Sequence, residues 1–324
     1  MADPRWEGTD RGNTQMRANG ADAVLLELAR DALKERTRSR RWRIFFWFMV
    51  AALLLSFLLF PLIAGLGKLG STGRHTAVVD ITGVIADGSP ANAEDIINSL
   101  EAAFESKQTA GIILRINSPG GSPVQSGMIF DEILSLRAKY PDTPVHAVLL
   151  DVTASGGYYI AAAADRIYAD RATVVGSIGV RMGSFGVVDA MEKLGIERRL
   201  ITAGENKAIL DPFQPENPDH RAHLQTVADV IHQQFIDAVK RGRGERLKES
   251  DELFSGLFWS GQEALELGLV DALGSERVVA RDVIGVENRV DYTYREGLAE
   301  KLLGSISQRI GAEILNHIYT PVIF

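Results

Sequence analysis

Cysteine is absent from this chain of 324 residues, which excludes disulfide bonds, thiolate zinc sites and cysteine nucleophiles. The absence does not fix the redox compartment. The sequence also lacks a phosphate-cradling G-x-x-x-x-G-K-[ST] loop and a cluster of metal ligands, so no cofactor or metal is implied. The formal net charge of −7 gives no reason to expect nucleic acid as a partner.

Charged residues are missing from residues 44–66, a run rich in Phe, Leu and Ile. A run of that length crosses a bilayer as a helix, whereas a buried helix would normally carry some polar positions. A basic block precedes it, formed by Lys34, Arg36, Arg38, Arg40, Arg41 and Arg43. Because positive residues stay on the cytoplasmic side, we predict a signal anchor with a cytoplasmic N-terminus and an exported C-terminal portion. The length of the run disfavours a cleaved signal peptide.

The chain divides into five predicted regions: a cytosolic tail (1–43), the anchor (44–66), a glycine-rich linker (67–75), a soluble domain (76–290), and a C-terminal helix and tail (291–324). Residues 21–36 have apolar residues at helical spacing. This spacing is typical of an amphipathic helix on the membrane surface, or equally of a solvated lead-in to the anchor.

Strands and helices alternate through the soluble domain. The predicted strands are 77–85, 111–116, 145–150, 166–169 and 198–202, and the predicted helices are 93–107, 124–140, 156–164, 187–194, 219–241 and 299–314. The alternation predicts an α/β fold with parallel strands. Functional loops are then expected at the carboxyl ends of the strands, where two glycine-rich turns fall, at 119–121 and 155–157.

The second turn carries a candidate nucleophile, Ser155, between a buried strand and a helix of small residues. Backbone N–H groups at the start of such a helix surround the hydroxyl and can stabilise an anion. The alternative is a serine that only caps the helix, which is the commoner role of a lone serine at this position.

A serine nucleophile needs a group that takes its proton, usually histidine. The histidines are His75, His146, His220, His223, His232 and His317. His146 lies on the strand before Ser155, but about 30 Å away along an extended chain. Three others fall on the amphipathic helix 219–241, where solvated roles are expected. Histidine is therefore a poor candidate for the base.

Lysine is the other option, because a desolvated ammonium loses its proton far below its usual pKa. Lys207 stands in a turn after a predicted strand, with Ala208, Ile209 and Leu210 following it. The alternative is an ordinary solvated loop lysine, which local context by itself favours.

Five segments, in this order, resemble the signal peptide peptidase A family, Ser–Lys membrane peptidases of the Clp protease/crotonase superfamily. They are NSPGG (117–121), ASGGYY (154–159), GSIGV (176–180), GENK with a following proline (204–212), and FSGLFWSGQEALELGLVDALG (254–274). The similarity spans about 78–274, and the single anchor is similar to the short-form members. The resemblance implies an α/β fold of repeated ββα units and makes the soluble domain a serine peptidase domain.

The resemblance also implies roles for single residues. Ser155 matches the nucleophile, and Lys207 matches the general base that deprotonates it and later protonates the leaving amine. Ser177 matches a serine that orients the lysine. The oxyanion hole is implied to come from the backbone N–H of Gly156 and from that of Gly121 or Gly120.

The implied function is an endopeptidase on the outer face of the bacterial cytoplasmic membrane that cuts apolar peptides such as signal-peptide remnants. Its implied partners are these peptides, misfolded membrane proteins, membrane lipid, and further copies of the chain in a ring such as an octamer. A catalytically silent peptide-binding scaffold is the alternative, which the intact Ser155 and Lys207 disfavour. A crotonase-like acyl-CoA enzyme is disfavoured by the anchor and the Ser–Lys pair. Residues 314–324 could pack on the domain, mediate assembly or fill a neighbouring groove.

Overall fold

The computed structural model describes residues 41–56, 59, 73–248, 250 and 252–295 and divides the chain into two units, Met1–Gly70 and Ser71–Phe324. In the first unit, residues 41–56 are helical, and most of their large apolar side chains are exposed. In the described part of the chain, no helix combines the length and the apolar character that a membrane crossing needs.

Several predictions concern residues outside the described part. These are the second half of the anchor (57–58 and 60–66), the helices 21–36 and 299–314, and the tail 314–324. They stay predictions.

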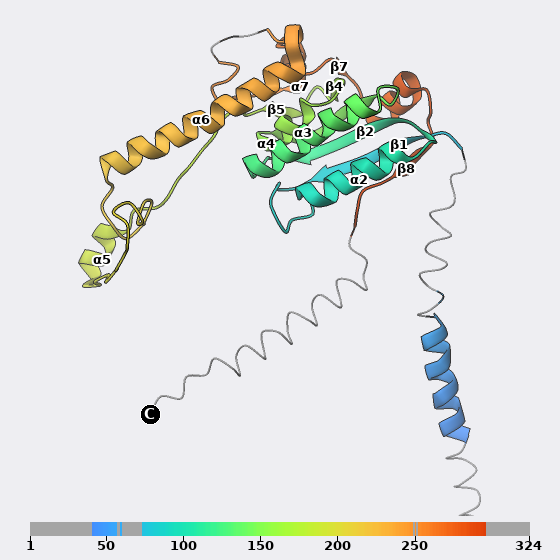
Figure 1. The fold of residues 1–324 in the computed structure, drawn as a ribbon, viewed down its shortest axis with the longest axis horizontal. Helices are drawn as coiled ribbons and strands as arrows, with labels where there is room; N and C mark the ends of the chain where they lie inside the picture. Colours follow the sequence, from blue (N-terminus) through green and yellow to red (C-terminus); the bar gives the residue numbers. More distant parts are fainter. Residues whose placement is uncertain (1–40, 57–58, 60–72, 249, 251, 296–324) are drawn as a thin grey trace, which may run out of the picture. The chain divides into compact units, whose positions relative to one another are not determined.

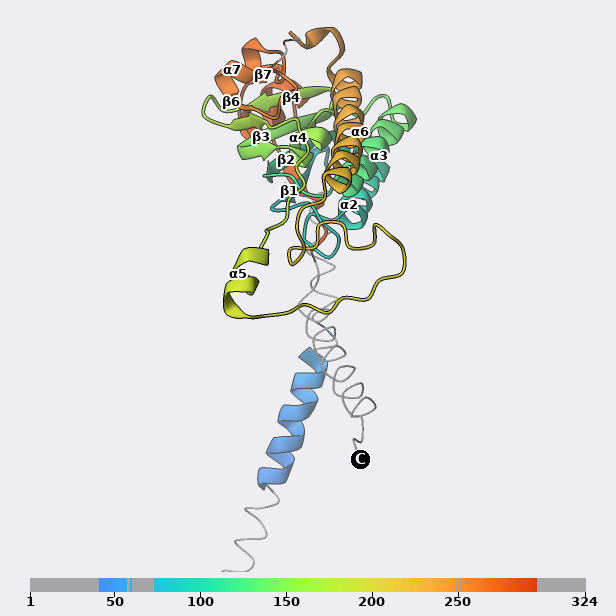
Figure 2. The same cartoon turned by 90° about the vertical axis from the view of Figure 1, so that its left-hand side faces the viewer.

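An eight-stranded sheet organises the second unit (Figures 1 and 2). Its order is β6-β5-β3-β2-β1-β8, and β4 pairs with both β3 and β7. The strands are β1 His75–Thr82, β2 Thr109–Ser118, β3 Val145–Ala154, β4 Arg166–Ala169, β5 Val174–Gly176, β6 Phe258–Ser260, β7 Ala272–Leu273 and β8 Arg289–Asp291. Among the described strands every pairing is parallel except that of β5 with β6. The prediction of an α/β fold with a parallel-rich sheet is confirmed.

The helices are α2 Ala93–Glu105, α3 Pro123–Lys139, α4 Gly156–Ala161, α5 Val188–Leu194, α6 Pro218–Arg243, α7 Gly261–Glu266 and α8 Glu276–Val278, with the 3-10 turn η1 Gly244–Arg246 and the π-helix η2 Val279–Ile284. Side chains cap the N-termini of α2, α3, α6 and α7, whereas α4, α5 and α8 begin without such a cap. The Asn92 side chain caps α2, and Ser122 caps α3, whose first residue is a proline. α4 is shorter than the predicted 156–164.

Apolar residues on both faces of the sheet are buried. Alternate residues of the central strands, such as Val79 and Leu114, belong to the large core. The residues between them, such as Val78 and Ile113, belong to a smaller cluster that η2 covers. In Figure 1, α2, α3 and α4 lie over one face of the sheet. Covering both faces is what a parallel sheet requires.

The predicted strand 198–202 is wrong. This segment has no regular structure, and Ile201 is 98% exposed. Two adjacent apolar residues suggested a strand, but a strand needs a neighbour to accept and donate its backbone hydrogen bonds. No strand of the described sheet borders the segment, so its apolar residues form no strand.

A buried ion pair holds the C-terminal end of α6 to the sheet. The Arg243 side chain is fully buried, and its Nη1 donates to Asp271 Oδ2 at 2.8 Å. Its Nε and Nη2 donate to the carbonyl of Gly268. Burial raises the pKa of Asp271, but the hydrogen bonds from Arg243 and from the N–H of Ile167 outweigh it and hold that pKa below its ordinary value. The pair therefore favours the ionised carboxylate.

Replacing Arg243→Leu should lower the free energy of unfolding by about 3 kcal/mol, because it leaves the Asp271 carboxylate and the Gly268 carbonyl without their buried donor. Urea denaturation of the purified protein measures the change. Arg281→Leu is the matched control, since Arg281 pairs with Asp282 on the surface and its loss should leave the unfolding free energy nearly unchanged. Equal effects of the two substitutions would contradict the assignment.

Candidate active site

Ser155 adopts a backbone conformation that residues other than glycine rarely take. Its φ is 51° and its ψ is −125°, directly after the last residue of β3. Its N–H donates to the carbonyl of Gly176 at 2.8 Å, and its carbonyl accepts from the N–H of Tyr159 at 2.9 Å. Such a conformation costs about 1–3 kcal/mol and persists only where the surroundings enforce it. Strand-to-helix turns of this kind expose a nucleophile at the edge of a sheet.

Ser155 does not act as a helix cap. It occupies the N-cap position of α4, but its side chain makes no capping hydrogen bond. The helix is instead held by Tyr158, which is fully buried and donates its hydroxyl to the carbonyl of Leu269 at 2.7 Å. Burial raises the pKa of Tyr158 above its ordinary value, so this donor keeps its proton. The hydroxyl of Ser155 is therefore not engaged by the helix that it begins.

Glycines are required where the β2 turn meets the Ser155 turn. Gly120 has a φ of 100°, and a Cβ built on it would lie 2.6 Å from the Cβ of Ser155 and 2.7 Å from the nitrogen of Gly156. A Cβ on Gly156 would overlap the hydroxyl of Ser126 and lie 3.3 Å from the nitrogen of Gly121. The two backbones touch, and only residues without a side chain allow this approach.

The two candidate donors in the first turn differ in how their N–H groups are used. The N–H of Gly120 donates to the hydroxyl of Ser118 at 3.1 Å. Gly121 forms a parallel bridge with Ile85, in which Ile85 bonds to the residues on either side of Gly121. The N–H of Gly121 is not used in that bridge and lies beside Gly156. Gly121 is thus the better placed of the two to stabilise an oxyanion.

Ser177 lies next to Ser155 through the pairing of β3 with β5. Ala154 is in register with Gly176, so the serine after each strand sits at the same edge of the sheet. Ser177 also has a positive φ, of 52°, and its N–H donates to the carbonyl of Leu257 at 2.7 Å. The structure therefore brings together Ser155, Ser177 and the glycine pair.

Sequence reasoning did not single out His232, which α6 places beside this site. Its Nε2 donates to the carbonyl of Ile178 at 3.1 Å, one residue after Ser177. Three residues further along α6, the ring of Phe235 stacks on Tyr159 with 4.9 Å between centroids. No sequence signal reveals the contact, because 54 residues separate its two partners.

Lys207 lies at the opposite end of α6. It is exposed, in a turn where its N–H donates to the carbonyl of Gly204. The preceding residue, Asn206, is bonded to His220 in the first turn of α6. His220 and His232 are separated by twelve residues of helix, which is about 18 Å. Figures 1 and 2 show α5 and the loop after it projecting beyond the sheet at that end of α6. Within one chain, the structure does not bring Lys207 beside Ser155.

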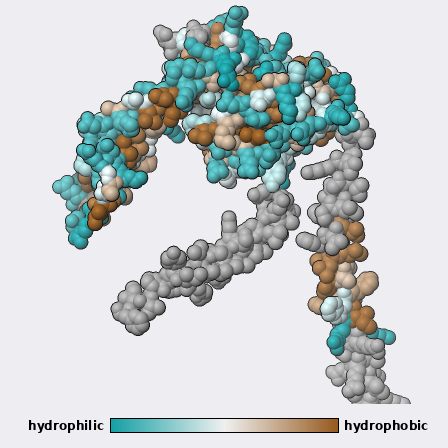
Figure 3. All heavy atoms as spheres, in the orientation of Figure 1, coloured by the Kyte–Doolittle hydropathy of each residue, from teal (hydrophilic) through white to brown (hydrophobic). Residues whose placement is uncertain are grey.

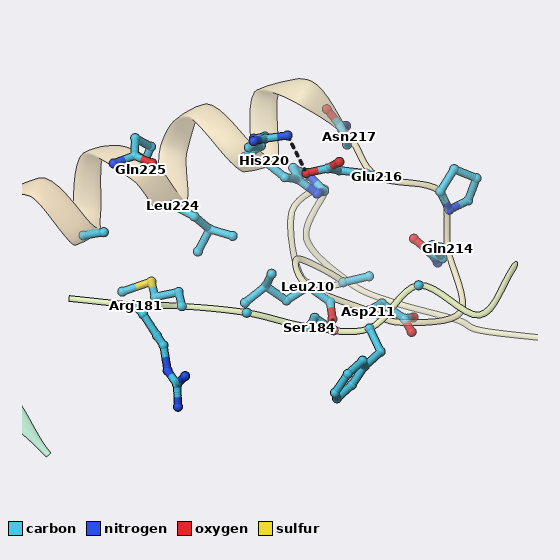
Figure 4. Close-up of a pocket in the computed structure, with 18 of the residues that line it drawn as sticks. Arg181, Ser184, Leu210, Asp211, Gln214, Glu216, Asn217, His220, Leu224 and Gln225 are labelled. Carbon is cyan, nitrogen blue, oxygen red and sulfur yellow. Dashed lines mark hydrogen bonds and ion pairs between the residues drawn. The ribbon is translucent and has the colours of Figure 1, made fainter. Parts of the chain in front are cut away.

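We call residues 180–231 the arm. They include the N-terminal part of α6, residues 218–231. A cavity of about 810 Å³ lies within it. Figure 4 shows His220, Leu224 and Gln225 on one side of this cavity and Arg181, Ser184 and Leu210 on the other. Its lining includes neither serine of the site. Across the described residues, no group of three or more metal-ligating side chains converges.

Two family models match residues of the second unit. The model of peptidase family S49 matches residues 137–284, and that of Clp protease matches residues 75–175. A Synechocystis chain named as an inferred protease is 35% identical over 206 residues, which are 64% of this chain and 72% of that one. The chain belongs to peptidase family S49. The resemblance to signal peptide peptidase A is thereby confirmed at the level of the family.

Two further relatives each match 63% of the chain. An Enterococcus faecium chain named for signal peptide peptidase SppA is 30% identical over 213 residues, which are 63% of this chain and 61% of its own. A Brucella abortus chain named as the Na(+)/H(+) antiporter NhaA is 45% identical over 207 residues, which are 63% of this chain. This chain spans only 28% of the Brucella protein. The match concerns the shared segment and carries no statement about ion transport.

Replacing Gly120→Ala should lower the free energy of unfolding by about 1–3 kcal/mol, because the new Cβ collides with Ser155 and needs a strained positive φ. Gly127→Ala is the control. Gly127 is in α3, and the nearest atom to its added Cβ would be the Tyr159 hydroxyl at 3.9 Å, so alanine should be neutral or stabilising there. Chemical denaturation of both variants measures the difference. A destabilised Gly127 variant beside an unchanged Gly120 variant would contradict the geometry.

Proposed function

We propose that this protein is a serine endopeptidase in which Ser155 is the nucleophile and Lys207 the general base. The observation that carries the proposal is the strained backbone of Ser155, whose side chain caps no helix and whose turn lies against the glycine turn at residues 120–121. Membership of peptidase family S49 supports it. The role of Lys207 rests on the motif resemblance, because the structure leaves it in the arm.

The proposed chemistry follows from these groups. The neutral amine of Lys207 takes the hydroxyl proton while Ser155 Oγ attacks the peptide carbonyl. The N–H groups of Gly121 and Gly156 donate to the oxyanion that forms. The ammonium of Lys207 then protonates the leaving amine as the C–N bond breaks, and water hydrolyses the acyl-enzyme with the same base. Ser177, next to Ser155, would orient the lysine.

The placement of the base supports assembly of several copies. Lys207 and the Ser155 turn lie at opposite ends of a rigid stretch of α6, so one chain does not pair them without a large rearrangement. The arm also exposes apolar side chains, including Phe185 at 86% and Ile201 at 98%, and exposed apolar surface of this kind marks interaction sites. We therefore propose a homo-oligomer in which Lys207 of one copy reaches Ser155 of the next.

Apolar peptides are the proposed substrates, with signal-peptide remnants as the expected class. Exposed apolar side chains flank the backbone around Ser155. Val84 adjoins the bridge to Gly121, Val124 is the second residue of α3 after the same turn, and Phe258 follows the residue that binds Ser177. Side chains of this kind favour apolar segments over charged ones.

The alternative function is a silent peptide-binding scaffold of the same fold. It would keep the exposed apolar residues but would have no need of the strain at Ser155, which costs stability without serving peptide binding. The peptidase is therefore the better supported function.

Activity should require both residues but not on the same chain. Ser155→Ala and Lys207→Ala should each abolish cleavage of a fluorogenic peptide containing Ala and Leu, since each removes a group that acts in the transition state. Co-expression of the two variants should restore part of the activity, because some contacts then pair an intact serine with an intact lysine. Lys193→Ala, which changes another exposed lysine of the arm, is the control and should stay active.

Activity retained in either single variant would remove that residue from the mechanism. Two inactive variants without recovery on co-expression would contradict the exchange of bases between copies.

We also propose that residues 44–66 anchor the protein in the bacterial cytoplasmic membrane with the peptidase domain outside. The full chain should then stay in the membrane fraction after alkaline carbonate extraction, and protease added to spheroplasts should digest the domain. A variant with Leu53, Leu54 and Leu55 changed to Lys should be released, because charges at a helix centre oppose insertion. Release of the unchanged chain would contradict the anchor.

A further inference from the structure

Two side chains hold the turn that carries Lys207 to the rest of the arm on its downstream side, after Lys207. The hydroxyl of Ser184 donates to the carbonyl of Leu210 at 2.9 Å. Asp211, whose side chain is only 7% exposed, accepts from Arg198 at 2.6 Å. Leu210 itself has a φ of 63°, a conformation that needs such external support.

On the upstream side, before Lys207, the residues of the turn are exposed. Gly204 has a φ of 101°, and the nearest atom to a Cβ built on it would be the Cβ of Lys207, at 3.9 Å. Glu205 and Asn206 are exposed. The side-chain link on this flank is the hydrogen bond of 2.9 Å between His220 Nε2 and Asn206 Oδ1, adjacent in sequence to Lys207.

Burial does not fix the arm. Figure 3 shows hydrophobic and hydrophilic side chains mixed along its surface, and none of the residues of α5 is buried. The buried residues of α6 begin only at Phe235. Directional polar contacts must therefore decide where the Lys207 turn lies relative to α6, because apolar packing is non-directional and here is largely missing.

We propose that His220 is a positioning residue for Lys207. Its ring N–H donates to Asn206 and fixes the turn on the first turn of α6, the helix whose His232 holds the carbonyl after Ser177. One helix thus contacts the Lys207 turn near its N-terminal end and the Ser177 segment near its middle, so it links the parts that one copy contributes to two neighbouring sites. This inference rests on the proposed function and adds a residue that acts on the base without touching the substrate.

The test compares five variants of the full chain in the peptide assay. His220→Phe keeps a ring but removes the donor, and should lower kcat about fivefold with little change in KM, the loss expected for one hydrogen bond. His220→Gln restores an N–H donor and should recover most of that loss. Asn206→Ala should match His220→Phe, and the double variant should lose no more than either one, because both remove the same contact. His223→Phe is the control, since His223 is exposed one turn further on and makes no side-chain hydrogen bond among the described residues.

The outcomes distinguish a positioning role of His220 from a packing role and from failure of the proposed function. Equal kcat for His220→Phe and His223→Phe, or additive losses in the double variant, would overturn the positioning role while leaving the peptidase intact. A loss that Gln does not recover would assign His220 a packing role instead. Absence of Ser155-dependent cleavage in the protein without substitutions would refute the proposed function itself, before any His220 variant is compared.

Discussion

The backbone pairing of β3 with β5 is the constraint on which the candidate site depends. It places Ala154 beside Gly176 and lets Gly176 accept the N–H of Ser155. That bond holds the chain at the point where Ser155 must turn with a positive φ into α4. The β2 turn then closes in from the other side, where glycine lets the two backbones meet. Strain at the serine is tolerated because bonds on both sides leave the chain little alternative.

α6 connects this site to a part of the chain that is held quite differently. Its C-terminal end is fixed by the buried pair of Arg243 and Asp271, and its middle by the contacts of His232 and Phe235. Its N-terminal half belongs to the arm, in which exposed apolar side chains and polar contacts replace a buried core. The proposed nucleophile therefore lies in a part of the domain that backbone hydrogen bonds hold from both sides, and the proposed base lies in a part held by polar contacts. Under the proposed exchange of bases between copies, assembly would control the activity.

Predictability from sequence varied with the range of the interaction involved. The central strands, the helices α2, α3 and α6, and both glycine turns followed from apolar periodicity, capping residues and glycine placement, which act over a few residues. The predicted strand at 198–202 was wrong because its apolar residues have no neighbouring strand to pair with. The contact of His232 with Ile178 could not be foreseen, because no local pattern encodes an encounter between residues far apart in the chain.

The sequence by itself determined the α/β class, the family and the candidate residues, because these depend on local patterns and on ordered motifs. Only the tertiary structure decided that Ser155 turns with a positive φ without capping its helix, that Gly121 rather than Gly120 keeps its N–H available, and that Lys207 lies a long helix away from the serine. Those features depend on which strands pair and where one helix leaves the core, and both are settled by packing across the whole domain.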